Sequence, residues 1–208
     1  MADFAVVKAI NGPAGNLEVA CALPDVEEIN GIAIICHPHP LFGGAMGNKV
    51  VTTLERFFRE RACATVRFNF RGVGASEGVF DDGIGESDDL KAVAQFARRY
   101  FPDAKLMLAG FSFGSYVAAR IANTLGAAQL VSIAPPVGKW DFAAIDMPHM
   151  PWTIVQGELD EIVEPQAVYD FVAQNQPGPT LIRIADATHF FHGKLLELRN
   201  ALAEHLNQ

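Results

Sequence analysis

Apolar and polar positions follow two different periods along this chain. Residues 32–36 are continuously apolar, which is typical of a strand covered on both faces. Residues 50–61 instead place Val50, Leu54 and Phe57 on one stripe, and residues 86–100 repeat that spacing. These two stretches predict helices that bury one face and expose the other.

The same patterns divide the whole chain into strands and helices. Strands are expected at residues 4–10, 17–23, 32–36, 64–70, 106–111, 130–134, 153–156 and 181–184. Helices are expected at residues 50–61, 86–100, 116–125, 166–173 and 195–206. The first two strands flank the turn formers of residues 11–15 and predict an antiparallel hairpin. The β-α alternation that follows predicts an α/β fold, with a mostly parallel twisted sheet of about eight strands and helices on both of its faces.

We expect a single domain over residues 1–208. A chain of 208 residues suits one well-buried core, and no internal repeat or low-complexity tract marks a second unit. Residues 135–151 connect two expected strands and have room for one short helical turn. A large lid over the sheet therefore does not fit there.

Composition narrows the classes of partner. Half of the residues are hydrophobic, the formal net charge is −8, and no block of Lys or Arg occurs, so neither nucleic acid nor an anionic membrane is an expected partner. The three cysteines lie in apolar runs, which predicts reduced structural thiols and a cytoplasmic protein. The N-terminus lacks a signal-peptide pattern. No apolar stretch approaches the ~20 residues that span a bilayer.

Residues 110–114 read Gly-Phe-Ser-Phe-Gly, a G-x-S-x-G motif between an expected strand and an expected helix. A sharp strand-to-helix turn exposes one serine hydroxyl at the tip of a sheet. Glycine is favoured two residues before and after the serine, because neighbouring backbone lies close at both positions. The turn also leaves the amide of Phe113 free at the helix start to bind an oxyanion. Ser112 is therefore the candidate nucleophile.

Two further polar residues follow later strands of the expected sheet. Asp160 comes after residues 153–156, and His189 comes after residues 181–184. Ligands of such sheets bind beyond the carboxyl ends of the parallel strands, and all three candidates fall in loops at that edge. The chain order Ser112, Asp160, His189 is the order expected for an α/β-hydrolase. The chemistry needs each residue type, because the imidazole takes the serine proton and the carboxylate orients the imidazole.

Other residues in the same loops are alternatives for two of these roles. Glu158, Glu161 and Asp186 are rival acids, and Asp186 is the strongest of the three. Asp160 itself could instead cap the following helix, but it lies several residues early for that position. His192 is a rival base. We expect it inside the start of the last helix, where it is less able to reach the serine.

These segments together resemble a known family. The matching stretches are residues 37–44 (His-Pro-His-Pro-Leu-Phe-Gly-Gly), 68–78, 110–114, 157–160 with Val163 and Pro165, and 188–191. With them the chain looks like a small, lidless bacterial serine hydrolase of the α/β-hydrolase superfamily. The resemblance implies carboxylic-ester hydrolysis with Ser112 as nucleophile, His189 as base and Asp160 as acid.

The resemblance also implies that the loop after the third strand supplies a second oxyanion amide beside that of Phe113. Pro38 stands where the family usually has glycine, and neither Pro38 nor Pro40 has an N–H group. The candidate donors are therefore the backbone amides of His39 and Leu41. Spacing alone does not choose between them.

Aromatic side chains surround the expected site. Phe42, Phe111 and Phe190, together with His37, are candidates for an apolar substrate pocket. His37 and His39 lack a Cys or an acid at ligand spacing, so no metal is expected. The glycines of residues 72–78 do not match a dinucleotide-binding loop, so no organic cofactor is expected. The acidic run of residues 81–89 is expected to be a solvated loop and a first helix turn.

The sequence therefore predicts a serine esterase that acts on a small ester or acyl substrate without a cofactor. A thioesterase, a peptidase or an acyltransferase would keep the same triad and change the acceptor or the bond. A non-catalytic binding protein is a further alternative, because fold alone does not fix function. Neither the natural substrate nor the oligomeric state follows from the sequence.

Overall fold

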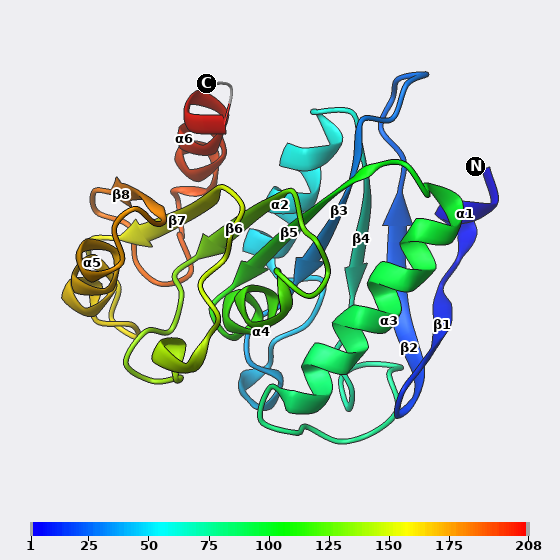
Figure 1. Ribbon diagram of the computed structural model, residues 1–208, viewed down its shortest axis with the longest axis horizontal. Coiled ribbons are helices and arrows are strands. Elements are labelled where there is room, and N and C mark those ends of the chain that lie inside the picture. Colours follow the sequence, from blue (N-terminus) through cyan, green and yellow to red (C-terminus); the bar gives the residue numbers. More distant parts are fainter. Residues whose placement is uncertain (1, 207–208) are drawn as a thin grey trace.

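The computed structural model describes residues 2–206 and contains an eight-stranded sheet (Figure 1). The strand order is β1-β2-β4-β3-β5-β6-β7-β8. The strands are β1 (Ala9–Gly12), β2 (Gly15–Ala22), β3 (Gly31–Cys36), β4 (Cys63–Phe68), β5 (Lys105–Phe111), β6 (Gln129–Ile133), β7 (Trp152–Gly157) and β8 (Thr180–Ile184). β2 runs antiparallel to β1 and β4, and the pairs from β4 to β8 are parallel. The expected mostly parallel sheet with an N-terminal hairpin is confirmed.

Helices cover both faces of the sheet, with α3 and α4 in front and α2 behind in Figure 1. The first face carries α1 (Ala2–Val6), α3 (Ile84–Tyr100), α4 (Phe113–Ile121) and α5 (Pro165–Gln174). The other face carries α2 (Lys49–Arg59) and α6 (Leu195–Leu206). The β6–β7 connection contains a single 3-10 turn, η2 (Phe142–Ala144), so residues 135–151 hold no more structure than the sequence predicted.

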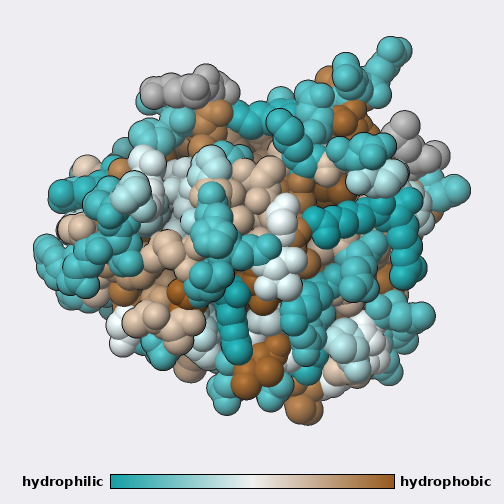
Figure 2. All heavy atoms as spheres, viewed as in Figure 1, coloured by the Kyte–Doolittle hydropathy of each residue, from teal (hydrophilic) through white to brown (hydrophobic). Residues whose placement is uncertain are grey.

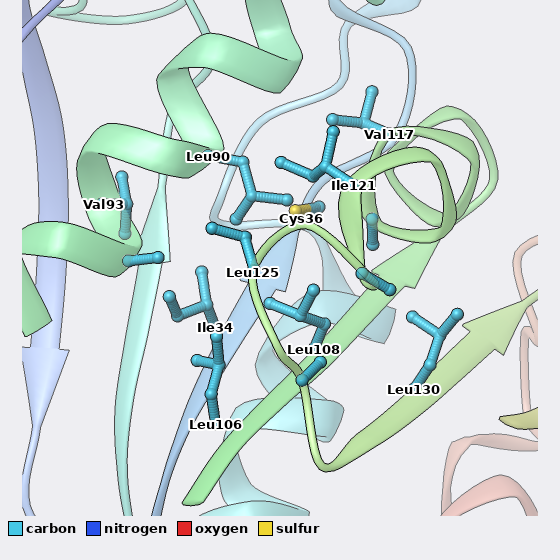
Figure 3. Packing of buried hydrophobic residues seen from close by; sticks show 14 of the residues in the cluster. Ile34, Cys36, Leu90, Val93, Leu106, Leu108, Val117, Ile121, Leu125 and Leu130 are labelled. Carbon is cyan, nitrogen blue, oxygen red and sulfur yellow. The ribbon is translucent and has the colours of Figure 1, made fainter. Parts of the chain in front are cut away.

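The central strand β3 shows why its sequence is continuously apolar. Ile32 and Ile34 belong to the core cluster beneath α3 and α4, whereas Ala33 and Ile35 belong to the cluster beneath α2 and α6. All four residues are fully buried, and burial of each isoleucine stabilises the fold by about 1.5–3 kcal/mol. Figure 3 shows the first cluster, in which side chains of α3 and α4 face those of β3, β5 and β6.

The direction in which successive strands are added to the sheet changes at β3. β4 pairs with one side of β3, and β5 pairs with the other side. The segments that follow lead to helices on opposite faces, because α2 follows β3 and α4 follows β5. Such a switch point leaves a crevice beyond the carboxyl ends of the two strands. The loop after β3 and the serine after β5 therefore meet at this crevice.

The first expected strand, residues 4–10, is wrong in its N-terminal half. Residues Ala2–Val6 form α1, and β1 spans only Ala9–Gly12. Phe4 is fully buried, with its ring 5.9 Å from that of Phe96 and 5.0 Å from that of Phe101 between centroids. The aromatic end of α3 thus determines the local structure here, because a helical turn directs Phe4 into this cluster.

The acidic run of residues 81–89 is not wholly solvated, which corrects the expectation from composition. Glu86 and Asp89 are fully buried. Glu86 accepts hydrogen bonds from the amides of Asp81 (3.0 Å) and Gly83 (2.8 Å) at the start of α3. Asp89 accepts from the amide of Arg71 (3.0 Å) and pairs with its guanidinium (2.8 Å). Both carboxylates hold the β4–α3 loop in place.

The three cysteines are buried and free, as expected for structural thiols. Burial raises the pKa of Cys63 to about 11 and that of Cys21 to about 12, against smaller opposing effects of Arg61 and Lys8. Burial also raises the pKa of Cys36. The reactive thiolate form is therefore scarce near neutral pH.

The outer surface over α3 and α4 is largely hydrophilic, with apolar groups in small patches (Figure 2). Among the helices of residues 2–206, none is long and apolar enough to cross a bilayer. Large exposed apolar side chains occur mainly in loops that follow strands: Leu41, Phe42, Val79, Leu159, Ile162 and Phe190. Exposed apolar surface thus gathers at the edge of the sheet that contains the crevice.

Asp89→Ala should lower the free energy of unfolding by about 3 kcal/mol, because it leaves the largely buried guanidinium of Arg71 without its partner. Asp88→Ala is the matched control. Asp88 lies beside Asp89 on α3 but pairs with Lys91 at an exposed position, so its loss should cost less than about 1 kcal/mol. Urea unfolding followed by circular dichroism measures both variants. Equal losses would contradict a structural role for the buried pair.

Candidate active site

Ser112 lies in a strained turn between β5 and α4. Its φ is 51° and its ψ is −122°, a combination that non-glycine residues rarely adopt. The two flanking glycines explain how the turn is possible. A Cβ on Gly110 would lie 2.3 Å from the carbonyl oxygen of Gly114, and a Cβ on Gly114 would lie 2.5 Å from the carbonyl oxygen of His37. The amide of Ser112 also donates to the carbonyl of Ile133 (2.8 Å), which ties the turn to β6.

Ser112, His189 and Asp160 form one hydrogen-bonded row. Nε2 of His189 lies 3.2 Å from Oγ of Ser112. Nδ1 of His189 lies 2.9 Å from Oδ2 of Asp160 and 3.1 Å from Oδ1. His189 is 3% exposed and Asp160 is 7% exposed, so the imidazole and the carboxylate meet away from solvent. An imidazole in this position can accept the serine proton while the carboxylate stabilises the resulting positive charge.

Asp160 is held by donors on both carboxylate oxygens. Oδ1 accepts from the amides of Ile162 (2.9 Å) and Val163 (2.7 Å), and Oδ2 accepts from Nε2 of Gln156 (2.9 Å). Burial alone would raise the pKa of Asp160, but the bonds from His189, Val163 and Ile162 outweigh it and lower that pKa below its usual value. The carboxylate is therefore ionised near neutral pH.

The loops that carry Asp160 and His189 approach each other closely. A Cβ on Gly157 would lie 2.4 Å from the carbonyl oxygen of Ala187, so only glycine allows this approach. Oε2 of Glu161 accepts a hydrogen bond from the amide of His189 (3.1 Å), which fixes the second loop to the first. Glycine and a loop carboxylate thus set the distance between the acid and the imidazole.

The rival residues lie elsewhere. Glu158 pairs with Arg183 at 2.7 Å, and Glu161 accepts a hydrogen bond from the backbone amide of His189 rather than from its ring. Asp186 is exposed in a turn with φ of 55°, and His189 bonds to Asp160 instead. Asp160 does not cap α5, whose N-cap residue is Glu164.

His192 also differs from its expected place, because it precedes the last helix. α6 begins at Leu195, and His192 lies in the turn before it. The left-handed conformations of Phe191 (φ 53°) and Gly193 (φ 72°) interrupt helical geometry on both sides of His192. Its ring stacks on Phe190 at 5.9 Å between centroids.

The structure distinguishes the two amides that the sequence left open for an oxyanion. His39 lines the same cavity as Ser112, and its amide has no acceptor among residues 2–206. The amide of Leu41 donates to Nδ1 of His39 (3.2 Å), and Leu41 lies outside the cavity lining. Phe113 is the first residue of α4, so its amide lacks an acceptor within the helix. Of the two candidates in the loop after β3, His39 therefore has the free amide, and the amide of Phe113 lies free at the start of α4.

His37 is a structural residue and does not line the cavity, which corrects its assignment to the pocket. It is fully buried. Its Nδ1 donates to the carbonyl of Pro38 (2.6 Å) and its Nε2 accepts from the amide of Phe70 (3.0 Å). Burial lowers the pKa of His37 to about 4, although the Pro38 bond opposes the shift. The neutral ring thus links the ends of β3 and β4.

Of the four residues expected to line the substrate pocket, two do so and two do not. Phe42 and Phe190 line the cavity, with exposed fractions of 86% and 37%. Phe111 is fully buried in the core behind β5, where its ring lies 5.1 Å from that of His189. Phe111 therefore supports the imidazole from behind, and with His37 it lies outside the cavity lining.

The cavity at Ser112 and His189 has a volume of about 390 Å³. Its remaining lining is Pro38, His39, Phe42, Gly43, Gly44, Asn48, Lys139, Ile162 and Phe190. Volume alone does not identify this cavity as the candidate active site, because the hollow beside Pro24 is larger, at about 510 Å³. The row of serine, imidazole and carboxylate distinguishes it.

Solved structures of bacterial proteins are closely similar to this chain. An α/β serine hydrolase without a lid from Xanthomonas campestris is 50% identical, with a TM-score of 0.92 over 96% of this chain and 92% of that one. An α/β serine hydrolase homologue from Coxiella burnetii is 47% identical, with a TM-score of 0.92 over 95% of each chain. The chain belongs to the lidless α/β serine hydrolases.

A curated relative of this hydrolase is an uncharacterized protein of Rickettsia prowazekii. It is 34% identical over 206 residues, which cover 94% of this chain and 86% of that protein. No protein-family model matches the sequence. The resemblance drawn from the sequence motifs is confirmed for both the family and the fold.

Three polar residues of this hydrolase's site were not singled out from the sequence. Gln156 contacts Asp160, and Asn48 and Lys139 line the cavity. Gln156 interrupts an otherwise apolar strand end, which is a detectable signal for a buried polar role. Asn48 and Lys139 lie in loops, where no local pattern indicates that a side chain reaches the cavity.

Proposed function

We propose that this hydrolase cleaves carboxylic esters through an acyl-enzyme intermediate on Ser112. The observation that carries the proposal is the continuous row from Oγ of Ser112 through His189 to Asp160, with contacts of 3.2 Å and 2.9 Å. In the first step, Oγ attacks the ester carbonyl carbon while Nε2 of His189 takes the hydroxyl proton. Asp160 stabilises the imidazolium that forms.

The negative charge that develops on the carbonyl oxygen needs donors that are already in place. The amides of Phe113 and His39 serve this role in the proposal. Phe113 opens α4, so the helix dipole adds to the stabilisation. His39 is supported by its hydrogen bond from Leu41. Loss of a single oxyanion donor typically costs about 10²–10³ in kcat.

His189 then gives its proton to the leaving alcohol, and the carbon–oxygen bond of the ester breaks. A water molecule, deprotonated by the same imidazole, attacks the acyl-serine. The bond between the acyl carbon and Oγ then breaks, the imidazolium returns its proton to Oγ, and the carboxylic acid leaves. The cavity suits an ester with apolar groups, because Phe42, Ile162 and Phe190 contribute to its lining.

Ser112→Ala should abolish hydrolysis of p-nitrophenyl butyrate and labelling by a fluorophosphonate, because both reactions need the Oγ nucleophile. Ser115→Ala is the matched control. The Ser115 hydroxyl lies one turn along α4 and bonds only to the Ser112 carbonyl among the described residues (2.6 Å), so that variant should keep both activities. Steady-state kinetics and intact-protein mass spectrometry measure the outcome. Labelling that persists in Ser112→Ala would remove Ser112 from the mechanism.

Asp160→Asn should lower kcat on the order of 10⁴-fold, because an amide no longer stabilises the imidazolium. Asp186→Asn should change kcat less than twofold, because Asp186 is exposed while His189 bonds to Asp160. Both kcat values are measured with p-nitrophenyl butyrate at saturating concentration. A larger loss in Asp186→Asn would reassign the acid.

A further inference from the structure

Gln156 is a buried polar residue at the end of β7 that touches the acid of the proposed triad. It is 0% exposed, and its Nε2 donates to Oδ2 of Asp160 (2.9 Å) and to the carbonyl of Gly157 (3.2 Å). We infer that Gln156 is a positioning residue that holds the Asp160 carboxylate in the orientation His189 requires. This inference rests on the proposed function.

The surroundings of Gln156 fix which way its amide points. Asp160 Oδ2 and the Gly157 carbonyl are both acceptors, so the NH₂ group must face them. The amide oxygen Oε1 then remains buried without a hydrogen-bond partner among residues 2–206. A buried acceptor without a partner is unfavourable for folding. An apolar side chain of the same length would avoid that penalty but would leave Asp160 Oδ2 and the Gly157 carbonyl without this donor, so the function of the glutamine lies in the two bonds that its NH₂ group donates.

The contact with Gln156 completes the restraint on Asp160. Two backbone amides hold Oδ1, whereas the donors to Oδ2 are Nε2 of Gln156 and Nδ1 of His189. Without Gln156, the oxygen nearest to the imidazole would have no fixed donor of its own. The carboxylate plane could then rotate about its bond to Cβ and would no longer define the direction of the His189 ring.

Gln156→Met tests the inference, because methionine is unbranched and of similar length but has no donor. We expect kcat for p-nitrophenyl butyrate to fall about 10-fold or more with KM nearly unchanged, since displaced catalytic groups affect the chemical step. The urea midpoint should change little, because the loss of the two bonds from Nε2 and the removal of the buried oxygen without a partner have opposite effects on stability. Fluorophosphonate labelling should become slower but still occur on Ser112.

Ser132→Ala is the matched control in the neighbouring strand. Ser132 is fully buried and accepts a hydrogen bond from Nε1 of Trp152 (3.0 Å), but it does not touch the triad. Its loss should lower the urea midpoint and leave kcat nearly unchanged, which is the opposite pattern. A Gln156→Met variant that loses stability in step with activity would overturn the inference.

Gln156→Glu supplies a readout that a merely structural role would not move. A glutamate in contact with Oδ2 of Asp160 is accommodated only in its protonated form, which can still donate as the amide does. The kcat/KM of Gln156→Glu should therefore fall with rising pH as this donor is lost, while that of the native chain stays level over the same range. A native-like profile would contradict the inference. If no variant, including the native chain, hydrolysed esters while Ser112 was still labelled, the proposed function would fail instead.

The cavity lining carries a second, independent inference about the substrate. Apart from Ser112 and His189, its polar side chains are His39, Asn48 and Lys139, and no carboxylate is among the lining residues. The chain as a whole has 24 acidic residues and a net charge of −8. Asp82 lies near enough to act on His39, yet it is outside the lining. The cavity lining therefore contains a lysine and no acidic side chain, whereas the molecule as a whole is acidic.

Lys139 is exposed and extends from a turn that hydrogen bonds and ring contacts hold in place. The amides of Lys139 and Trp140 both donate to the carbonyl of Pro136 (3.1 Å each). The indole of Trp140 packs 4.9 Å from the ring of Phe113 and 5.0 Å from that of Tyr116. Lys139 has no ion pair among residues 2–206. We propose that Lys139 recognises an anionic group on the ester, in either its acyl or its alcohol part.

Matched esters with and without a negative charge test this second proposal, which also rests on the proposed function. Mono-p-nitrophenyl glutarate against p-nitrophenyl pentanoate probes the acyl side, and 4-carboxyphenyl butyrate against 4-acetylphenyl butyrate probes the alcohol side. Lys139→Met should lower kcat/KM for the anionic member of one pair about 5-fold and leave its neutral partner unchanged. In the native protein, the ratio of kcat/KM for the anionic ester to kcat/KM for its neutral partner should fall as salt is added, because salt screens the charge of Lys139.

Lys105→Met is the control, since Lys105 is exposed at the opposite end of β5. Lys105→Met should leave the ratio of kcat/KM between the anionic and the neutral ester unchanged in both pairs. An equal effect of Lys139→Met on charged and neutral esters would overturn the substrate proposal and leave ester hydrolysis standing. Absence of hydrolysis of all four esters by the native chain would count against the proposed function itself.

Discussion

The close approach of α4 to the end of β3 is the constraint on which the rest of the site depends. Gly114 sits where any Cβ would collide with the carbonyl oxygens of Cys36 and His37. Because no side chain intervenes, the helix starts directly over the switch point of the sheet, and Ser112 must take its strained conformation to connect β5 with it. The same approach brings the amide of Phe113 next to the loop that carries His39.

Burial of polar groups supplies the second half of the site. Asp160 and His189 are nearly inaccessible to solvent, so each must be fully hydrogen bonded to be tolerated. Backbone amides, Gln156 and the Glu161 carboxylate meet that need. Local geometry therefore depends on a network in which each member limits the freedom of another. Such hydrogen-bonded networks make the site rigid and specify one arrangement of its side chains.

Sequence patterns predicted what depends on local period and chain order, and missed what depends on tertiary partners. The strands of the parallel sheet and the order of Ser112, Asp160 and His189 follow from periodicity and from loop position. The helix at Phe4 and the burial of Asp89 do not follow from local patterns. The first depends on aromatic rings far along the chain, and the second depends on Arg71, which follows β4. His37 was expected in the pocket for the same reason. Nothing in the local sequence distinguishes a histidine that joins two strands from one that lines a cavity.

The short β6–β7 connection has a consequence for the proposed chemistry. Trp140 packs on Tyr116 and Phe113, which holds this connection against the body of the molecule where a lid would otherwise emerge. The rim of the cavity is therefore formed by side chains of the short loops, such as Phe42, which is 86% exposed. Water reaches such an open site without a closing motion. An acyl group on Ser112 would thus be accessible to water throughout its lifetime, as the proposed hydrolysis requires.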